Sequence, residues 1–102
     1  MALSSKQRAY IKKLAHDIDP LVRVGREGIG DNLKASVLDA IRSRELIKVK
    51  IIQTCELTAR EVYDAMREWE EIELVDMIGR TIIVYKENKD KPRISTEVKK
   101  IK

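Results

Sequence analysis

The sequence predicts an α/β (α+β) fold in a single domain, ordered helix–strand–helix–strand–helix–strand–strand around a mixed four-stranded sheet. Two observations carry this prediction. Capped stretches with apolar residues at helical spacing alternate with short apolar stretches, and the last two of these are joined by Gly79-Arg80, a two-residue hairpin linker. The 102 residues, 43% of them hydrophobic, suffice for one core and are too few for two.

The first predicted helix has a clear start and a clear end. Ser4 stands at the N-cap position and Gln7 at the capping-box position. Apolar residues then recur at helical spacing, at Tyr10, Ile11, Leu14, Ala15 and Ile18. Asp19-Pro20 stops this pattern, so we expect the helix to end near His16.

Two further helices are predicted from the same signals. One follows Gly30-Asp31 and ends near Arg44. Its apolar stripe consists of Leu33, Val37, Ala40 and Ile41. The other opens with a second capping box, Thr58 followed by Glu61. Its apolar stripe consists of Val62, Ala65, Met66 and Trp69, and acidic residues occupy much of its other surface.

The predicted strands are residues 21–24, 45–52, 73–78 and 81–85. In the second strand, alternation directs Ile47, Val49 and Ile51 to one face and Lys48 and Lys50 to the other. Long charged side chains belong on a solvated face. We therefore expect the lysine face to be open, not covered by helices, and its lysines to be available to a ligand.

A glycine-rich loop, Val24-Gly25-Arg26-Glu27-Gly28-Ile29-Gly30-Asp31, lies between the first strand and the second helix. Gly25 and Gly28 can take positive φ and have no side chain to hold a ligand away, so that backbone N–H groups can converge on one anion. The positive end of the following helix adds attraction for a phosphate. A G-x-x-G loop of this kind clamps the nucleic-acid backbone in KH-type modules. The alternative is a simple strand-to-helix turn.

The net charge of +4 is unevenly distributed along the chain. Residues 1–50 hold 11 Lys and Arg against 6 Asp and Glu, whereas residues 51–79 hold 2 against 8. Residues 86–102 then hold 7 against 3. This distribution favours a two-faced surface with a polyanion partner on one side. The alternative is that the charged segments are solvated faces without a partner.

Several classes of function find little support. With one histidine (His16), one cysteine (Cys55) and no convergent Asp/Glu motif, no nucleophile, base or metal site is evident, so we expect neither an enzyme nor a cofactor. The absence of Phe and the 4% aromatic content disfavour base stacking on a sheet of the RRM kind. No apolar run has the length of a membrane span, and we expect a cytoplasmic protein with no membrane partner.

Four motifs occur in a fixed order: Leu3-Ser4-Ser5-Lys6-Gln7-Arg8, Val24-Gly25-Arg26-Glu27-Gly28-Ile29, Arg44-Glu45-Leu46-Ile47-Lys48-Val49-Lys50 and Ile78-Gly79-Arg80-Thr81-Ile82-Ile83-Val84-Tyr85-Lys86. Over about residues 3–86 the chain resembles the CRM domain (chloroplast RNA splicing and ribosome maturation), in particular its stand-alone YhbY-like members. The resemblance implies a fold similar to the C-terminal domain of translation initiation factor three. It also implies RNA binding and association with precursors of the large ribosomal subunit.

The chain departs from the family pattern at two positions. Gly30 stands where the family usually has threonine, and glycine is a weaker but acceptable N-cap. The interior of the loop, often doubly basic in the family, is Arg26-Glu27 here. A carboxylate beside a phosphate site lowers affinity, so Glu27 either points away or weakens binding.

The resemblance and the charge pattern together predict an RNA-binding CRM domain in residues 1–86. We expect it to bind structured RNA, ribosomal or pre-ribosomal, as a monomer without a small-molecule substrate. The predicted RNA-binding residues are Gly25, Arg26, Glu27, Gly28, Lys48, Lys50 and Arg80. Residues 87–102 are expected to form a basic extension, in part disordered, that attracts RNA without selecting its sequence. The alternative is an adaptor whose third, acidic helix docks a basic ribosomal protein.

Overall fold

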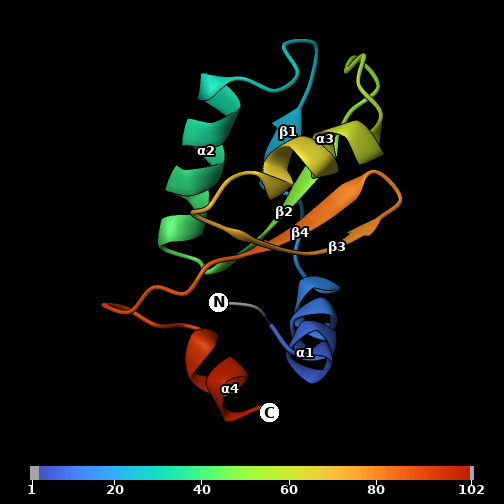
Figure 1. The fold of residues 1–102 in the computed structure, drawn as a ribbon. Coiled ribbons are helices and arrows are strands. Elements are labelled where there is room, and N and C mark those ends of the chain that lie inside the picture. The colour runs from blue at the N-terminus through green and yellow to red at the C-terminus, as the bar shows by residue number, and fades with distance from the viewer. Residues whose placement is uncertain (1–2, 102) are drawn as a thin grey trace.

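Four strands form one sheet with helices on both faces in a computed structural model, which describes residues 3–101 (Figure 1). The elements are α1 (Ser5–Ala15), β1 (Val22–Val24), α2 (Asp31–Arg42), β2 (Leu46–Ile51), α3 (Ala59–Arg67), β3 (Glu73–Ile78), β4 (Thr81–Tyr85) and α4 (Ser95–Lys100). The strand order is β1-β2-β4-β3, with β1 parallel to β2 and the other pairs antiparallel. The predicted mixed sheet and the order of elements through β4 are therefore confirmed.

Both predicted capping boxes are present. The Ser4 hydroxyl accepts the Gln7 N–H at 3.1 Å, and the Gln7 side chain accepts the Ser4 N–H at 2.8 Å. Thr58 and Glu61 make the same reciprocal contacts at 3.1 and 2.9 Å. Each box satisfies N–H groups that have no partner inside the helix. This local chemistry explains why the starts of α1 and α3 could be located from sequence.

The main core lies between the sheet and the pair α2 and α3. Its sheet side consists of Val22, Val24, Ile47, Val49, Ile51, Leu74, Ile82 and Val84, and its helix side of Leu33, Val37, Ala40, Ile41, Val62 and Met66. Each fully buried aliphatic side chain contributes about 1.5–3 kcal/mol. This core fixes the connection between β1 and α2, which carries the glycine loop.

The opposite face of the sheet is covered, and the expectation that it is open is wrong for most of its length. Helices α1 and α4 pack there in a second cluster, which contains Ile11, Ala15, Leu46, Val75, Ile83, Tyr85 and Val98. The expectation overlooked Leu46, which lies on the same face as Lys48 and Lys50 by strand alternation. Leu46 is apolar and only 8% exposed, because it packs in the second cluster. An apolar residue at this position indicated a partner for the lysine face.

Arg8 fixes α1 to β3. Its guanidinium donates to the carbonyl oxygens of Leu74 at 2.9 Å and Val75 at 3.0 Å, where the register of β3 against β4 shifts. A β-bulge leaves backbone groups outside the ladder, and Arg8 supplies donors for two such carbonyls. Lys12 adds an ion pair with Asp76 at 3.0 Å.

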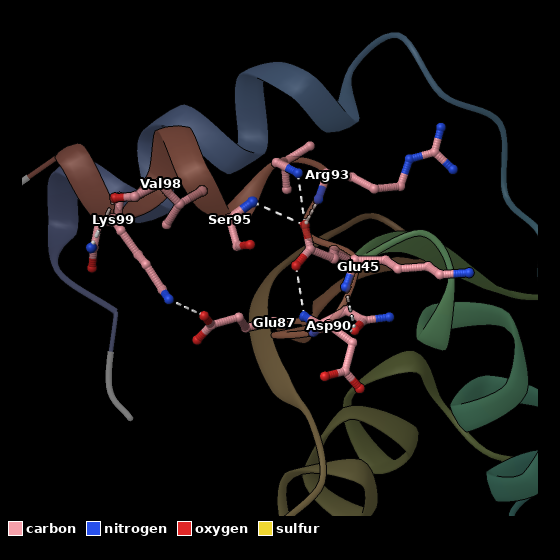
Figure 2. Close-up of polar contacts among 11 residues, drawn as sticks. Glu45, Glu87, Asp90, Arg93, Ser95, Val98 and Lys99 are labelled. Atoms are coloured by element: carbon pink, nitrogen blue, oxygen red, sulfur yellow. Dashed lines mark hydrogen bonds and ion pairs between the residues drawn. The ribbon is translucent and has the colours of Figure 1, made fainter.

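Glu45 holds the segment after β4 to the domain (Figure 2). The side chain is fully buried, and its Oε1 accepts the N–H groups of Arg93, Ile94 and Ser95 at 2.6, 2.7 and 3.0 Å. Its Oε2 accepts the N–H of Asn88 at 2.6 Å. Burial alone would raise the pKa of this carboxyl, but the N–H groups favour the charged form and lower the pKa to about 2.

Residues 87–101 consequently lie against the domain, in contrast to the partly disordered extension that the sequence predicted. Helix α4 places Val98 in the second cluster, where it is 2% exposed. The Gln7 amide donates to the carbonyl oxygens of Val98 and Ile101, both at 3.1 Å. With only six residues, α4 is too short to show a helical period in the sequence.

Candidate nucleic-acid interface

The glycine loop forms a tight turn at the end of β1. The Gly28 N–H donates to the Gly25 carbonyl oxygen at 3.0 Å, and Gly28 has a φ of +64°, in the left-handed region that favours glycine. The turn leaves the side chains of Arg26 and Glu27 exposed. Because its N–H is used within the turn, Gly28 contributes shape to the site and not a donor.

Gly25 has a different role. Its φ is not positive, so of the two glycines Gly28 alone takes the conformation that the sequence allows for both. A Cβ atom at Gly25 would lie 3.3 Å from both Ile52 Cδ1 and Thr54 Oγ1. Gly25 thus permits close packing of the loop on the residues after β2. The N–H of Ile52 donates to the Val24 carbonyl oxygen at 3.0 Å and joins the two segments.

A groove of about 630 Å³ lies beside the loop, between β1 and the first turns of α2. The loop residues 25–28, the β1 residues 22–24, and Gly30, Asp31, Asn32, Leu33 and Ser36 line it. Gly30 is the N-cap and offers no side-chain acceptor to the first N–H groups of α2. These N–H groups and the helix dipole make the groove suitable for an anion such as phosphate. Asp31 and Glu27, in the same lining, offset part of this attraction.

A row of four side chains crosses the sheet at the same end of the domain. The strand register places Arg23 opposite Lys50, Lys50 opposite Thr81, and Thr81 opposite Ile78. Arg23, Lys50 and Ile78 are exposed. The apolar contacts of α1 lie farther along the same face, against Leu46 and its neighbours in the second cluster. Arg23 also lines the groove, so the row and the groove form one surface.

Lys48 and Lys50, both predicted to bind RNA, have different environments. The Lys48 Nζ donates to the Ile18 carbonyl oxygen at 2.9 Å and the residue is half-buried, so it holds the connection between α1 and β1. Lys50 has no hydrogen bond or ion pair of its side chain within residues 3–101, and it is exposed. Lys50 is therefore the lysine of this pair that remains available to a phosphate.

Arg80 positions the end of the sheet. Its Nε donates to the Ile51 carbonyl oxygen at 2.9 Å and its Nη2 to that of Ile52 at 3.2 Å. The Ile51 N–H in turn donates to the Arg80 carbonyl oxygen at 2.8 Å. These contacts tie the β3–β4 hairpin to the segment on which Gly25 packs. Next to Arg80, Gly79 takes a φ of +61°, as a II′ turn requires of its first residue.

The acidic residues around α3 are partly paired with cations of the same chain. Asp64 lies 3.2 Å from Arg60, and Glu71 lies 3.0 Å from Lys34. The hydrogen bond with Lys34 lowers the pKa of the Glu71 carboxyl. Glu61 is engaged in the capping box. This pairing reduces the negative charge that α3 offers to a basic partner.

Within residues 3–101 no group of His, Cys, Asp and Glu gathers as metal ligands would, and no helix combines the length and apolarity of a membrane span. Cys55 is 7% exposed and belongs to the main core. His16 is the C-cap residue of α1. These residues therefore have structural positions consistent with packing and capping.

Two residues with important positions were missed from sequence. Arg23 stands between two inward-facing valines, and this alternation could have identified it as an outward cation beside Lys50 once the strand pairing was known. Glu45 gave no signal that distinguishes it from a first strand residue. Its four N–H donors come from residues 43 or more positions away.

Comparisons with known proteins identify the family. The model of the CRS1/YhbY (CRM) domain matches residues 3–86. A Bacillus subtilis relative named "Probable RNA-binding protein YqeI" is 37% identical, over 90% of this chain and 96% of its own length. A Haemophilus influenzae relative named "RNA-binding protein" is 30% identical, over 86% of this chain and 89% of its own.

The structure has a similar solved relative. The solution structure of SAV1595 from Staphylococcus aureus, described as an RNA-binding candidate, has a TM-score of 0.71 and 38% identity, over 86% of this chain and 92% of its own. The resemblance predicted from the four sequence motifs is thus confirmed by sequence and by fold. The chain belongs to the CRS1/YhbY (CRM) domain family.

Proposed function

We propose that this chain is a non-enzymatic RNA-binding protein that holds the RNA backbone at the loop end of its sheet. Its family and the names of two relatives and of one structural neighbour support RNA as the partner. The observation that carries the proposal is the joint surface formed by the groove, the loop residue Arg26 and the exposed pair Arg23 and Lys50. It combines uncapped helix N–H groups with cations on a rigid sheet.

The division of labour within this surface follows from the geometry. Arg26 projects from the turn closed by Gly25 and Gly28 and meets a phosphate at the groove, while Arg23 and Lys50 attract neighbouring phosphates. Arg80 acts by positioning, because its guanidinium is engaged with β2 carbonyl oxygens. The scarcity of aromatic residues favours recognition of RNA shape and backbone over base stacking.

The target we propose is structured ribosomal RNA in precursors of the large subunit, bound in the cytoplasm by a monomer. This target rests on the family resemblance. The adaptor alternative, docking of a basic ribosomal protein on α3, is less favoured because Asp64 and Glu71 are already paired within the chain.

Crosslinking in cells of the source organism, followed by sequencing of the bound RNA, tests the target directly. We expect enrichment of large-subunit precursor RNA over mature messenger RNA. Titration of the purified full chain with that RNA should show an affinity that falls steeply with salt, as phosphate contacts require. Retention of the chain by ribosomal proteins after nuclease treatment, without RNA crosslinks, would favour the adaptor.

A further inference from the structure

A small hollow lies beside the row of four side chains that crosses the sheet, between the end of α1 and the β3–β4 hairpin. Its volume of about 200 Å³ is smaller than that of a drug-sized site, which begins at about 300 Å³. Ile83, which is 1% exposed, forms its floor, and Ile78 and Pro20 contribute apolar surface. The hollow therefore has the dimensions and walls of a site for one flat group.

Ile78 is conspicuous in this lining because it is 58% exposed. Its neighbour across the hairpin is Thr81, and the next residue in the same row is Lys50. An exposed β-branched side chain at a hairpin contributes little to the core. Ile78 lines the hollow and lies in the same row as Lys50. A ligand with both an apolar face and a phosphate could contact these two side chains together.

The polar part of the lining includes a fixed donor, Lys48. The Lys48 ammonium is fixed by its bond to the Ile18 carbonyl oxygen at 2.9 Å, which leaves two of its three N–H groups free of that bond. Thr81 adds a hydroxyl, and His16 and Lys12 stand on the α1 side. Lys12 is engaged with Asp76 at 3.0 Å. A fixed ammonium facing an apolar hollow favours a ligand with carbonyl oxygens.

We propose that this hollow binds one unpaired nucleobase that presents a carbonyl oxygen where adenine and cytosine have an amino group, namely guanine through O6 or uracil through O4, of an RNA whose phosphates lie on Arg23 and Lys50. The inference rests on the proposed function and adds a base site to it. Proteins read RNA sequence mainly at bases splayed out of loops and bulges. A lysine donates readily to the O6 and N7 atoms of guanine, whereas adenine presents an amino group in place of O6. A phosphate alone would make no use of Ile78.

The test uses short RNA hairpins that differ at a single bulged position, which is guanosine, uridine, adenosine or an abasic site. For the full chain we expect the guanosine and uridine bulges to bind at least about 5-fold more tightly than the abasic one, because the abasic site lacks the base oxygen that would accept from Lys48 and the apolar face that would contact Ile78. Ile78→Ser should abolish this preference while the slope of affinity against salt stays unchanged. Leu21→Ser is the matched control, because Leu21 is also an exposed apolar residue, at 47%, and lies outside the hollow.

The outcomes separate the two proposals. Salt-dependent binding with equal affinity for all four bulges overturns the base site and leaves the proposed function standing. Binding of neither the hairpins nor ribosomal RNA in the same titration overturns both. Equal loss of preference in Ile78→Ser and Leu21→Ser also overturns the base site, since general surface apolarity would then be responsible. A 5-fluorouridine bulge gives an independent readout: its ¹⁹F resonance should shift with the wild-type chain and not with Ile78→Ser.

Discussion

The backbone N–H of Gly28 donates to the carbonyl oxygen of Gly25 at 3.0 Å, and this bond sets the shape of the candidate interface. The turn it closes directs Arg26 and Glu27 outward, while Gly25 packs against Ile52 and Thr54. The loop is therefore held by its own hydrogen bond and by packing on the residues after β2 before any ligand binds. Such preorganisation reduces the entropy lost on binding.

Replacement of Gly28 by valine should weaken RNA binding while the fold is kept. The φ of +64° is strained for a β-branched residue, which should lower the free energy of unfolding by about 1–3 kcal/mol. A Cβ there would meet only Leu57 Cδ1, at an ordinary 3.5 Å. Thermal unfolding and RNA titration measure the two effects. Loss of the folded state at 25 °C would show a structural role alone, and the loop assignment would lose its support.

Replacement of Glu27 by lysine should tighten RNA binding. Glu27 is exposed and lines the groove, so the exchange replaces a repulsive charge with an attractive one. We expect a gain of up to about 1 kcal/mol at low salt that shrinks as salt is added. Glu56→Lys, an exposed acid outside the groove, is the control for net charge. Equal gains in the two variants would place the loop outside the interface.

Glu45 should make stability depend on pH. Its pKa is about 2 in the folded state against an ordinary value of 4.5, so the stabilisation is complete above pH 4.5 and is lost as pH falls toward 2. The shift corresponds to about 3 kcal/mol by linkage. Glu45→Gln should be less stable than wild type at pH 7, and its stability should not show the decrease between pH 4.5 and pH 2 that comes from Glu45. Urea unfolding between pH 7 and pH 2 measures both, and parallel profiles for Glu45→Gln and wild type would contradict the role of Glu45.

The lysines of the C-terminal segment should attract all RNAs alike. Truncation before Asn88 would also remove Val98 from the second cluster, so charge replacement is the cleaner change. Lys89→Gln together with Lys91→Gln should lower affinity by one common factor for unrelated RNAs, with a shallower salt slope, because both residues are exposed and lie outside the groove. Filter binding with three unrelated RNAs checks this. A factor that differs between the RNAs would assign selectivity to the segment.

The parts of the fold that depend on local chemistry could be predicted from sequence. Capping boxes at Ser4 and Thr58, the glycine at the hairpin and the alternation of β2 each involve residues a few positions apart. These signals sufficed for the order of elements and for the loop. The loop and the charge pattern indicated a polyanion partner, and the family resemblance then specified RNA, with a protein-docking adaptor as the alternative.

The parts that depend on long-range contacts could not be predicted. Lys48 is engaged because its ammonium donates to the carbonyl oxygen of Ile18, 30 residues earlier. The C-terminal segment is held because its N–H groups donate to the Glu45 carboxylate. Leu46 was the one local sign that helices cover the lysine face. For the same reason Arg23 gained its significance only from the register that places it beside Lys50.

The most direct test of whether the loop end of the sheet holds the RNA backbone uses the double variant Arg23→Gln/Lys50→Gln. The measurement is the salt dependence of its RNA binding. The matched control is Arg60→Gln/Arg67→Gln, which removes two exposed cations from α3. If Arg23 and Lys50 each meet one phosphate, the first variant should lower the slope of log K against log salt by about 1.4 to 1.8, depending on strandedness. The control should keep the wild-type slope. An unchanged slope in Arg23→Gln/Lys50→Gln, or equal changes in both variants, would contradict the proposed interface.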